Sequence, residues 1–381
     1  MRSSVLFSYL LILLATACVD RISFDFEKPP NNSISISGYI SDQPGPYEIR
    51  INNVFDIESK ESTKIPISVK QLKMSDNKGN SEILSEVNKG IYQTDPSGIK
   101  GQVDGVYAIT VELFDGRIYE SLPDTILPAG SLDSLYLELK SKYNSIGEKI
   151  YSYDIFFDAS YDANSNNNKF IWKQTSTYQV ETHPEYAQGA CFWMPEISKC
   201  NFVPPCSGYR NTGDNIHPVF EKLFTCTCCI CWYSIYNENL ILSDDHLTRR
   251  GELNGVNASN IPLDKWTLAY KIRVEMSQMS LTDNSYHFWK AIRDQKEATG
   301  SLFQPITGKI PSNFIQTSGN TTRVEGIFFA TSINSKVKYL QKFELPTEVV
   351  LSIPTEKPIK AGDCRDAFPH STNIKPPFWI D

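Results

Sequence analysis

The sequence of 381 residues has little positive charge and no long basic segment. Lys and Arg number 37 against 44 Asp and Glu, which gives a formal net charge of -7. No basic run or basic-aromatic stripe is present that could follow a phosphate backbone. We therefore expect no nucleic acid among its partners.

The short motifs that identify common active sites are also missing. There is no G-x-S-x-G, H-E-x-x-H, P-loop or G-x-G-x-x-G pattern, so nucleophilic, zinc and phosphate chemistry lack their usual residues. The five histidines form no recognisable pair with Ser, Cys or an acid. We predict no catalytic residue, no metal site and no cofactor, although a glycosidase pair of carboxylates would leave no short motif.

One apolar run stands out, and it is too short to span a membrane. Arg2 precedes Val5 to Leu14, and Ala15-Thr16-Ala17-Cys18 follows. A charged start, a short apolar stretch and a small-residue exit are typical of a secretory signal, here residues 1–17. Cys18 resembles the lipobox cysteine at which bacterial lipoproteins are cut and acylated, so we predict a lipid such as palmitate on Cys18. The alternative is ordinary cleavage at the same small residues.

The segment that follows suits a tether. Residues 18–32 are acidic and have Pro29-Pro30 near their end, and proline-rich segments are extended. Acyl chains on Cys18 would hold the protein on a bilayer, because each buried methylene contributes about 0.8 kcal/mol.

The remainder of the chain has the pattern of a mainly β protein. Hydrophobic residues make up 40% and aromatic residues 12%, enough for packed cores. Short alternating segments separated by turn residues predict an immunoglobulin-like or transthyretin-like β-sandwich over 33–125. After a boundary at Pro123 to Gly130, a second β-rich domain is expected over 131–381, closed by a hairpin of Thr322 to Thr331 with Lys336 to Leu340.

One helix is expected, from about Asp283 to Ala298. Thr282 is suited to the N-cap position, and Asp283 supports the first turn. The helical spacing gives an aromatic face that we expect to pack on a sheet rather than to bind a ligand; its residues are Tyr286, Phe288, Trp289, Ile292 and Arg293.

Of nine cysteines, eight remain once Cys18 is assigned to the lipid. An even number in an exported chain favours disulfides, although eight cysteines allow 105 pairings. A zinc site built on Cys228-x-x-Cys231 is the alternative. Adjacent Cys228 and Cys229 are expected to reach different partners. Most of these residues lie in a long loop over 188–232, and the disulfide candidates are Cys191, Cys200, Cys206, Cys226, Cys228, Cys229, Cys231 and Cys364.

The order of these motifs resembles a family of lipoproteins of unknown function, DUF4249. The resemblance rests on the lipobox and on the following segments: Phe24-Asp25-Phe26-Glu27, Gly38 to Asp42 before Pro44-Gly45-Pro46-Tyr47, Tyr107 with Asp115 to Tyr119, Cys228-x-x-Cys231-Trp232, Tyr286-x-Phe288-Trp289, Asp363-Cys364-Arg365 and Pro376-Pro377-Phe378-Trp379. Members are typically encoded beside a TonB-dependent receptor of a Gram-negative outer membrane. The resemblance implies a lipid-anchored accessory protein of the outer membrane with such a receptor as partner.

These observations leave three hypotheses about function. The leading one is an accessory or ligand-binding module for a TonB-dependent transporter. Its expected surface lies in the cysteine-rich loop, because aromatic residues there can stack on a ligand or anchor a partner; they are Phe192, Trp193, Tyr209 and Trp232. Covering the disulfides is the competing role for these aromatics. The other two hypotheses are a hydrolase of a surface polymer and a structural envelope protein.

Overall fold

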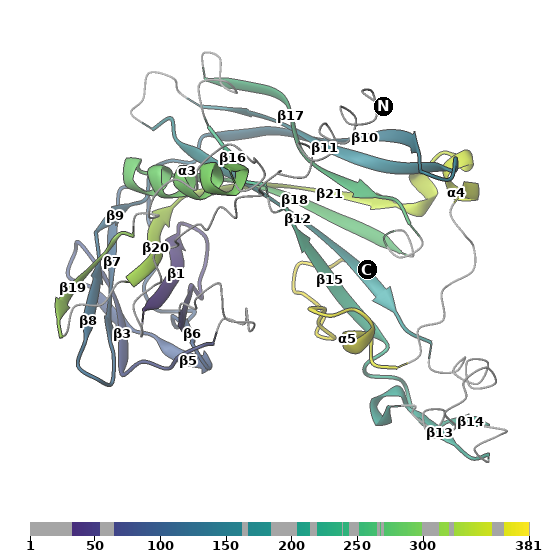
Figure 1. The fold of residues 1–381 in the computed structure, drawn as a ribbon, viewed down its shortest axis with the longest axis horizontal. Coiled ribbons are helices and arrows are strands. Elements are labelled where there is room, and N and C mark those ends of the chain that lie inside the picture. Colours follow the sequence, from purple (N-terminus) through teal and green to yellow (C-terminus); the bar gives the residue numbers. More distant parts are fainter. Residues whose placement is uncertain are drawn as a thin grey trace, which may run out of the picture.

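The computed structural model describes residues 33–53, 65–161, 167–183, 204–213, 219–237, 239–243, 251–264, 267, 270–298, 312–319, 324–352 and 362–380. Strands dominate these ranges, and they form two β-rich bodies that meet near one long helix (Figure 1). The expected mainly β, two-domain class is confirmed. Within the same ranges no helix has the length and hydropathy to cross a membrane.

The N-terminal body is a sandwich of two sheets. One sheet contains, in spatial order, β20 (Val324–Thr331), β1 (Ile34–Ser41), β2 (Glu48–Asn53), β6 (Ile91–Gln93) and β5 (Ser85–Asn88). The other contains β19 (Phe314–Ser318), β8 (Ile118–Ser121), β7 (Val106–Glu112), β3 (Gln71–Asp76) and β4 (Ser81–Ile83), with β9 (Asp124–Thr125) beside β7. Alternate side chains such as Ile36, Ile49 and Val111 are fully buried between the sheets, as strand periodicity requires.

Two strands of this sandwich come from far along the chain. Strand β20 runs parallel to β1, and β19 runs antiparallel to β8. The sequence-based division had placed both in the second domain, and it had joined the β20 segment in a hairpin with residues 336–340. The structure corrects this: β21 (Ile333–Gln341) pairs with β18 (Lys271–Ser280) in another sheet. Only Ser332 separates β20 from β21, which is too short for a hairpin turn.

The second body also packs sheet on sheet. Its first sheet contains β10 (Ser131–Tyr143), β11 (Lys149–Ser160) and β17 (Glu252–Pro262). The second contains β15 (Ile230–Tyr236), β12 (Phe170–Glu181), β18 and β21 in that order, with β16 (Ile241–Leu242) beside β12. Phe157, Trp172 and Val274 lie in the core between them. This five-stranded sheet therefore has one face in this core and a second face turned away from it.

Helix α3 (Asp283–Ala298) has the bounds that the sequence predicted. The Ser285 backbone N–H lies 3.5 Å from Thr282 Oγ1, the expected N-cap contact. Tyr286 and Phe288 are buried against Ile327 and Phe329 of β20, so the aromatic face packs on a sheet as expected.

Six shorter elements belong to the C-terminal half of the chain. They lie on the second body, away from the sandwich (Figure 1). They are η3 (Pro205–Ser207), β13 (Tyr209–Asn211), β14 (Phe220–Lys222), η4 (Lys342–Glu344), α4 (Thr347–Ser352) and α5 (Cys364–Ala367). Strands β13 and β14 pair as a small two-stranded sheet, and α5 lies beside β15.

Asp124 joins the two bodies. This buried carboxylate, 5% exposed, accepts hydrogen bonds from Thr282 Oγ1 at 2.5 Å, Ser285 Oγ at 2.8 Å and the Ala330 backbone N–H at 3.0 Å. Burial raises the pKa of Asp124, while the three hydrogen bonds act in the opposite direction. One side chain thus connects the sandwich to the start of α3 and to β20.

We expect Asp124→Ala to lower the free energy of unfolding by about 1–3 kcal/mol, because the buried Ala330 N–H loses its acceptor. Urea unfolding followed by tryptophan fluorescence measures the change. The matched control is Asp133→Ala, since the Asp133 carboxylate is exposed and accepts a local hydrogen bond from Ser131, and a surface change stays within about 0.5 kcal/mol. Equal effects of the two substitutions would contradict the proposed role of Asp124.

Candidate functional site

The five-stranded sheet that contains β12 and β18 has an outer face, turned away from the core of the second body, whose Ile171 and Met279 end packs on α3 and β20. On β12, Trp172, Tyr178 and Val180 point into the core. Because side chains alternate along a strand, the odd-numbered residues of β12 point to the opposite side. The same alternation holds on β18, where Ile272, Val274 and Met276 are core residues. We define the outer face by the residues between them: Lys173, Thr175, Thr177 and Gln179 on β12, and Arg273, Glu275 and Ser277 on β18.

The C-terminal segment 362–380 covers one end of the outer face. The Phe378 ring lies 4.3 Å from Arg273 Cζ, a cation–π contact. Trp379 meets Trp232 edge to face, with ring centroids 6.4 Å apart, and the backbones of Trp232 and Thr372 exchange two hydrogen bonds. This segment closes the β15 side of the sheet.

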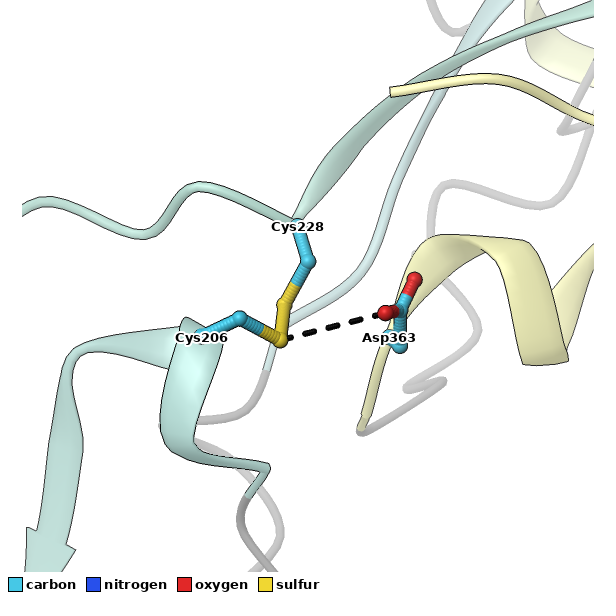
Figure 2. Close-up of side chains that lie close together, drawn as sticks. All are labelled: Cys206, Cys228 and Asp363. Atoms are coloured by element: carbon cyan, nitrogen blue, oxygen red, sulfur yellow. Dashed lines mark hydrogen bonds between the residues drawn. A yellow bond between two sulfur atoms is a disulfide. The ribbon is translucent and has the colours of Figure 1, made fainter.

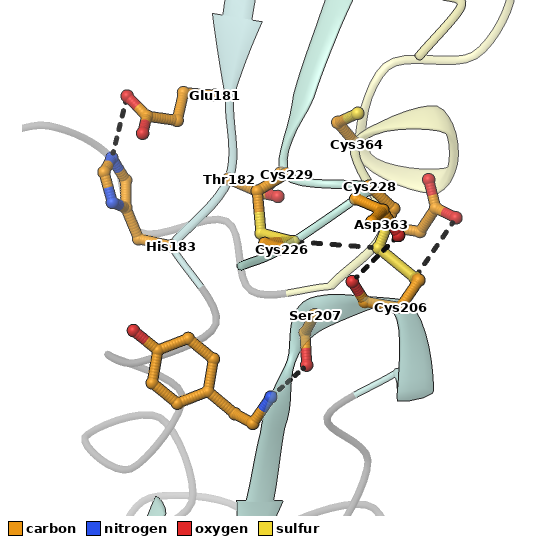
Figure 3. The surroundings of a disulfide bond; sticks show 12 residues. Glu181, Thr182, His183, Cys206, Ser207, Cys226, Cys228, Cys229, Asp363 and Cys364 are labelled. Atoms are coloured by element: carbon orange, nitrogen blue, oxygen red, sulfur yellow. Dashed lines mark hydrogen bonds and ion pairs between the residues drawn. A yellow bond between two sulfur atoms is a disulfide. The ribbon is translucent and has the colours of Figure 1, made fainter. Parts of the chain in front are cut away.

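Three disulfides lie at this covered end, and Figure 3 shows two of them, Cys206–Cys228 and Cys226–Cys229. Cys231 of β15 is bonded to Cys364 of α5 across a sequence separation of 133, and both residues are 0% exposed. Cys206 is bonded to Cys228 and Cys226 to Cys229. Adjacent Cys228 and Cys229 therefore have different partners, as the sequence predicted.

Asp363 lies beside the Cys206–Cys228 disulfide (Figure 2). Its carboxylate caps α5 by accepting from the Arg365 backbone N–H at 2.8 Å, and the Arg365 guanidinium lowers the pKa of Asp363. Asp363 Oδ2 lies 3.8 Å from Cys206 Sγ, which is a contact rather than a hydrogen bond because a disulfide sulfur has no hydrogen. Only thiolates ligate metals well, so this pairing does not offer the sulfur ligands that the zinc alternative requires.

The structure places some of the predicted site residues and not others. All six cysteines in the described ranges are paired, whereas Cys18, Cys191, Cys200, Phe192 and Trp193 lie outside those ranges. Tyr209 is half-buried on β13. Trp232 is 9% exposed and packed on Trp379, so it belongs to the cover of the disulfides rather than to an accessible surface.

The most unusual site residue is one that the sequence analysis missed. Lys173 Nζ lies 5.0 Å from the ring centroid of Trp289, 5.8 Å from that of Tyr39 and 5.9 Å from that of Phe329. We call these three rings the aromatic cage. Burial lowers the pKa of Lys173 from 10.5 to about 8. The rings come from β1, α3 and β20, which are remote from β12 in sequence, so no local pattern signals the cage.

The outer face is accessible between the aromatic cage and the part that the C-terminal segment covers. Tyr39 is 36% exposed beside Lys173, and Tyr236, opposite Thr175 in the β-sheet register, is 70% exposed. The hydroxyls of Ser277 and Ser335 lie 2.8 Å apart on the neighbouring strands. Aromatic rings, hydroxyls and a cation on a rigid sheet are suited to binding a polar ligand.

The fold and the site define a class: a two-domain β-rich protein with a disulfide-bonded end and a caged lysine on its outer sheet face. The model of one family, described as "Domain of unknown function (DUF4249)", matches residues 19–337. The chain therefore belongs to this family, as its motifs had indicated.

The other comparisons add little. No curated protein matches the chain significantly. Among solved structures, trypsin-activated alpha-2-macroglobulin from Escherichia coli is 11% identical, with a TM-score of 0.15. That match covers 68% of this chain and 15% of the macroglobulin chain. At this TM-score it carries no structural or functional argument.

Proposed function

We propose that this protein is a lipid-anchored ligand-binding module of the outer membrane that serves a TonB-dependent transporter. The accessible part of the outer face supports a binding role, because it combines the exposed rings of Tyr39 and Tyr236 with the hydroxyls of Ser277 and Ser335. Its carboxylate, Glu275, lies 2.6 Å from Arg273 Nη1 and is therefore engaged in an ion pair rather than available as an acid catalyst. Family membership and the lipobox-like sequence before Cys18 support the membrane setting.

The proposal predicts that Cys18→Ala abolishes lipid attachment and releases the protein from the membrane fraction, since the acyl chains are its expected anchor. Metabolic labelling with a palmitate analogue measures the attachment, and fractionation measures the release. The matched control is the double variant Cys226→Ala with Cys229→Ala, which removes two cysteines from the folded part and is expected to remain labelled. Labelling that survives Cys18→Ala would overturn the lipid assignment.

The transporter partnership needs its own experiment. Gentle detergent extraction of the native protein, followed by mass spectrometry of co-purified proteins, is expected to recover a TonB-dependent receptor with the unaltered chain. Recovery without any such receptor, from membranes that contain the lipidated protein, would contradict the accessory role while leaving the anchor intact.

A further inference from the structure

We propose that the aromatic cage around Lys173 is the binding site for an organic carboxylate, a small acid whose apolar body packs on the rings. This inference rests on the proposed function of a ligand-binding module and names the chemical class of its ligand. Lys173 lies where the two bodies of the protein meet.

The cage belongs to both bodies. Tyr39 and Phe329 are side chains of the sandwich strands β1 and β20, Trp289 is on α3, and Lys173 is on β12 of the second body. Tyr39 and Phe329 lie 5.4 Å apart, and Phe329 meets Trp289 edge to face at 5.9 Å. The three rings therefore form a continuous, preorganised wall beside the ammonium group.

Lys173 has no anionic partner anywhere in the described ranges. Two carboxylates, Glu275 and Glu48, act electrostatically on the cage. Each already has a cation, since Glu275 lies 2.6 Å from Arg273 Nη1 and Glu48 lies 2.6 Å from Arg50 Nε. Rings attract a cation, but they only partly replace its hydration. A largely desolvated lysine without a counter-ion marks a candidate functional site.

A second unsatisfied donor lies at the same place. The Trp289 indole Nε1 is buried and has no hydrogen-bond acceptor among the described residues. Lys173 thus has no carboxylate partner and the neighbouring Trp289 N–H has no acceptor among the described residues, whereas buried donors are otherwise almost always paired. A ligand that brings oxygen acceptors and a negative charge supplies what both groups lack.

The donor set favours a carboxylate over other anions. One ammonium and one indole N–H match the two oxygens and single charge of a carboxylate. A phosphate group has more charge and more acceptor oxygens, and proteins usually hold it with Arg forks or helix N-termini. Thr175 and Ser277 lie next to Lys173 on the outer face, so their hydroxyls can reach other polar groups of the ligand.

The test titrates benzoate into the full mature chain and measures the heat of binding. We expect saturable binding that Lys173→Met weakens about tenfold or more, because a charged hydrogen bond is lost. The matched control is Lys271→Met: Lys271 Nζ lies 5.4 Å from the Trp379 ring and 5.6 Å from the Tyr339 ring, but it also donates to the Ile380 carbonyl oxygen. Lys271→Met is expected to leave benzoate binding unchanged.

Two further titrations define the ligand class. Benzamide, which keeps the ring but has no charge, and inorganic phosphate, which lacks an apolar body, are both expected to bind far more weakly than benzoate. Benzoate binding is expected to fall more than tenfold between about pH 7 and pH 9.5, as Lys173 loses its proton. Equal binding of benzamide or phosphate, or equal binding by Lys173→Met, would overturn the inference.

Receptor recovery separates this inference from the proposed function. Lys173→Met is expected to co-purify with the receptor as the unaltered chain does, because the site is for a small acid. If benzoate does not bind and Lys173→Met also loses the receptor, the small-acid site is refuted. Lys173 would then contact a carboxylate side chain of the receptor instead. If benzoate binds but no receptor is recovered, the site stands and the accessory role fails.

Discussion

Replacing Cys231 and Cys364 together by alanine is expected to lower the free energy of unfolding by about 5 kcal/mol. The bond closes a loop with a sequence separation of 133, and chain entropy makes the constraint on the unfolded state larger for longer loops. The bond also holds α5 against β15, so its loss is expected to release the C-terminal segment from Trp232 and Arg273. Urea unfolding measures the first effect and limited proteolysis the second.

The matched control removes Cys226 and Cys229 together. This disulfide lies at the same end of the sheet but has a sequence separation of only 3, so the loss is expected to be about 2 kcal/mol. The C-terminal segment is expected to remain resistant to protease in this variant. Two equal losses of stability would show that loop length does not determine the contribution of these bonds.

Lys173→Met is expected to raise the free energy of unfolding at pH 7 by about 1–3 kcal/mol. Burial lowers the pKa of Lys173 to about 8 from 10.5, so the folded state holds its proton less tightly than the unfolded state. Each unit of pKa difference corresponds to about 1.4 kcal/mol, and attraction to the three rings offsets part of the cost. Methionine has a similar length and no charge to bury.

The difference in the free energy of unfolding between Lys173→Met and the unaltered protein is expected to depend on pH. The unaltered protein is expected to gain stability as pH rises from about 8 to about 10.5, because over that range the unfolded state binds more protons than the folded state. The advantage of Lys173→Met should therefore shrink between about pH 8 and pH 10.5. Urea unfolding at pH 7, 9 and 10.5 measures it. A Lys173→Met protein that is less stable at pH 7 would show that Lys173 contributes to the fold.

Lys271→Met is again the control, with the opposite expected sign. Lys271 has both ring contacts and a carbonyl acceptor at Ile380, so its removal is expected to cost up to about 1 kcal/mol. A residue whose replacement stabilises the fold and abolishes ligand binding is one retained for function rather than for stability.

Local features of the sequence predicted local structure well. The N-cap position of Thr282 and the helical spacing after it predicted α3 because both act within a few residues. Alternation in Ile34 and Ile36 predicted β1, because successive side chains of a strand point to opposite faces. Such patterns can be read without knowing the neighbours of the element, although packing supplies most of its stability.

Partner choice over long distances was not predictable in this way. The alternation over residues 324–331 correctly indicates a strand, but it does not say that β20 pairs with β1, nearly 300 residues away. The cysteine pairing is similar, since spacing alone leaves 105 arrangements for eight cysteines. The cage was missed for the same reason, because a lysine on a strand reads as a solvated residue until its neighbours are known.

The sequence by itself determined the mainly β class, the long helix, the family and the expectation that Cys18 carries a lipid. Each depends on residues close together in the chain or on the order of short motifs. Only the tertiary structure decided that two late strands complete the sandwich, that Trp232 is buried and that Lys173 lies among three rings. These depend on contacts between distant segments, which are set by the free energy of packing the whole chain rather than by any local pattern.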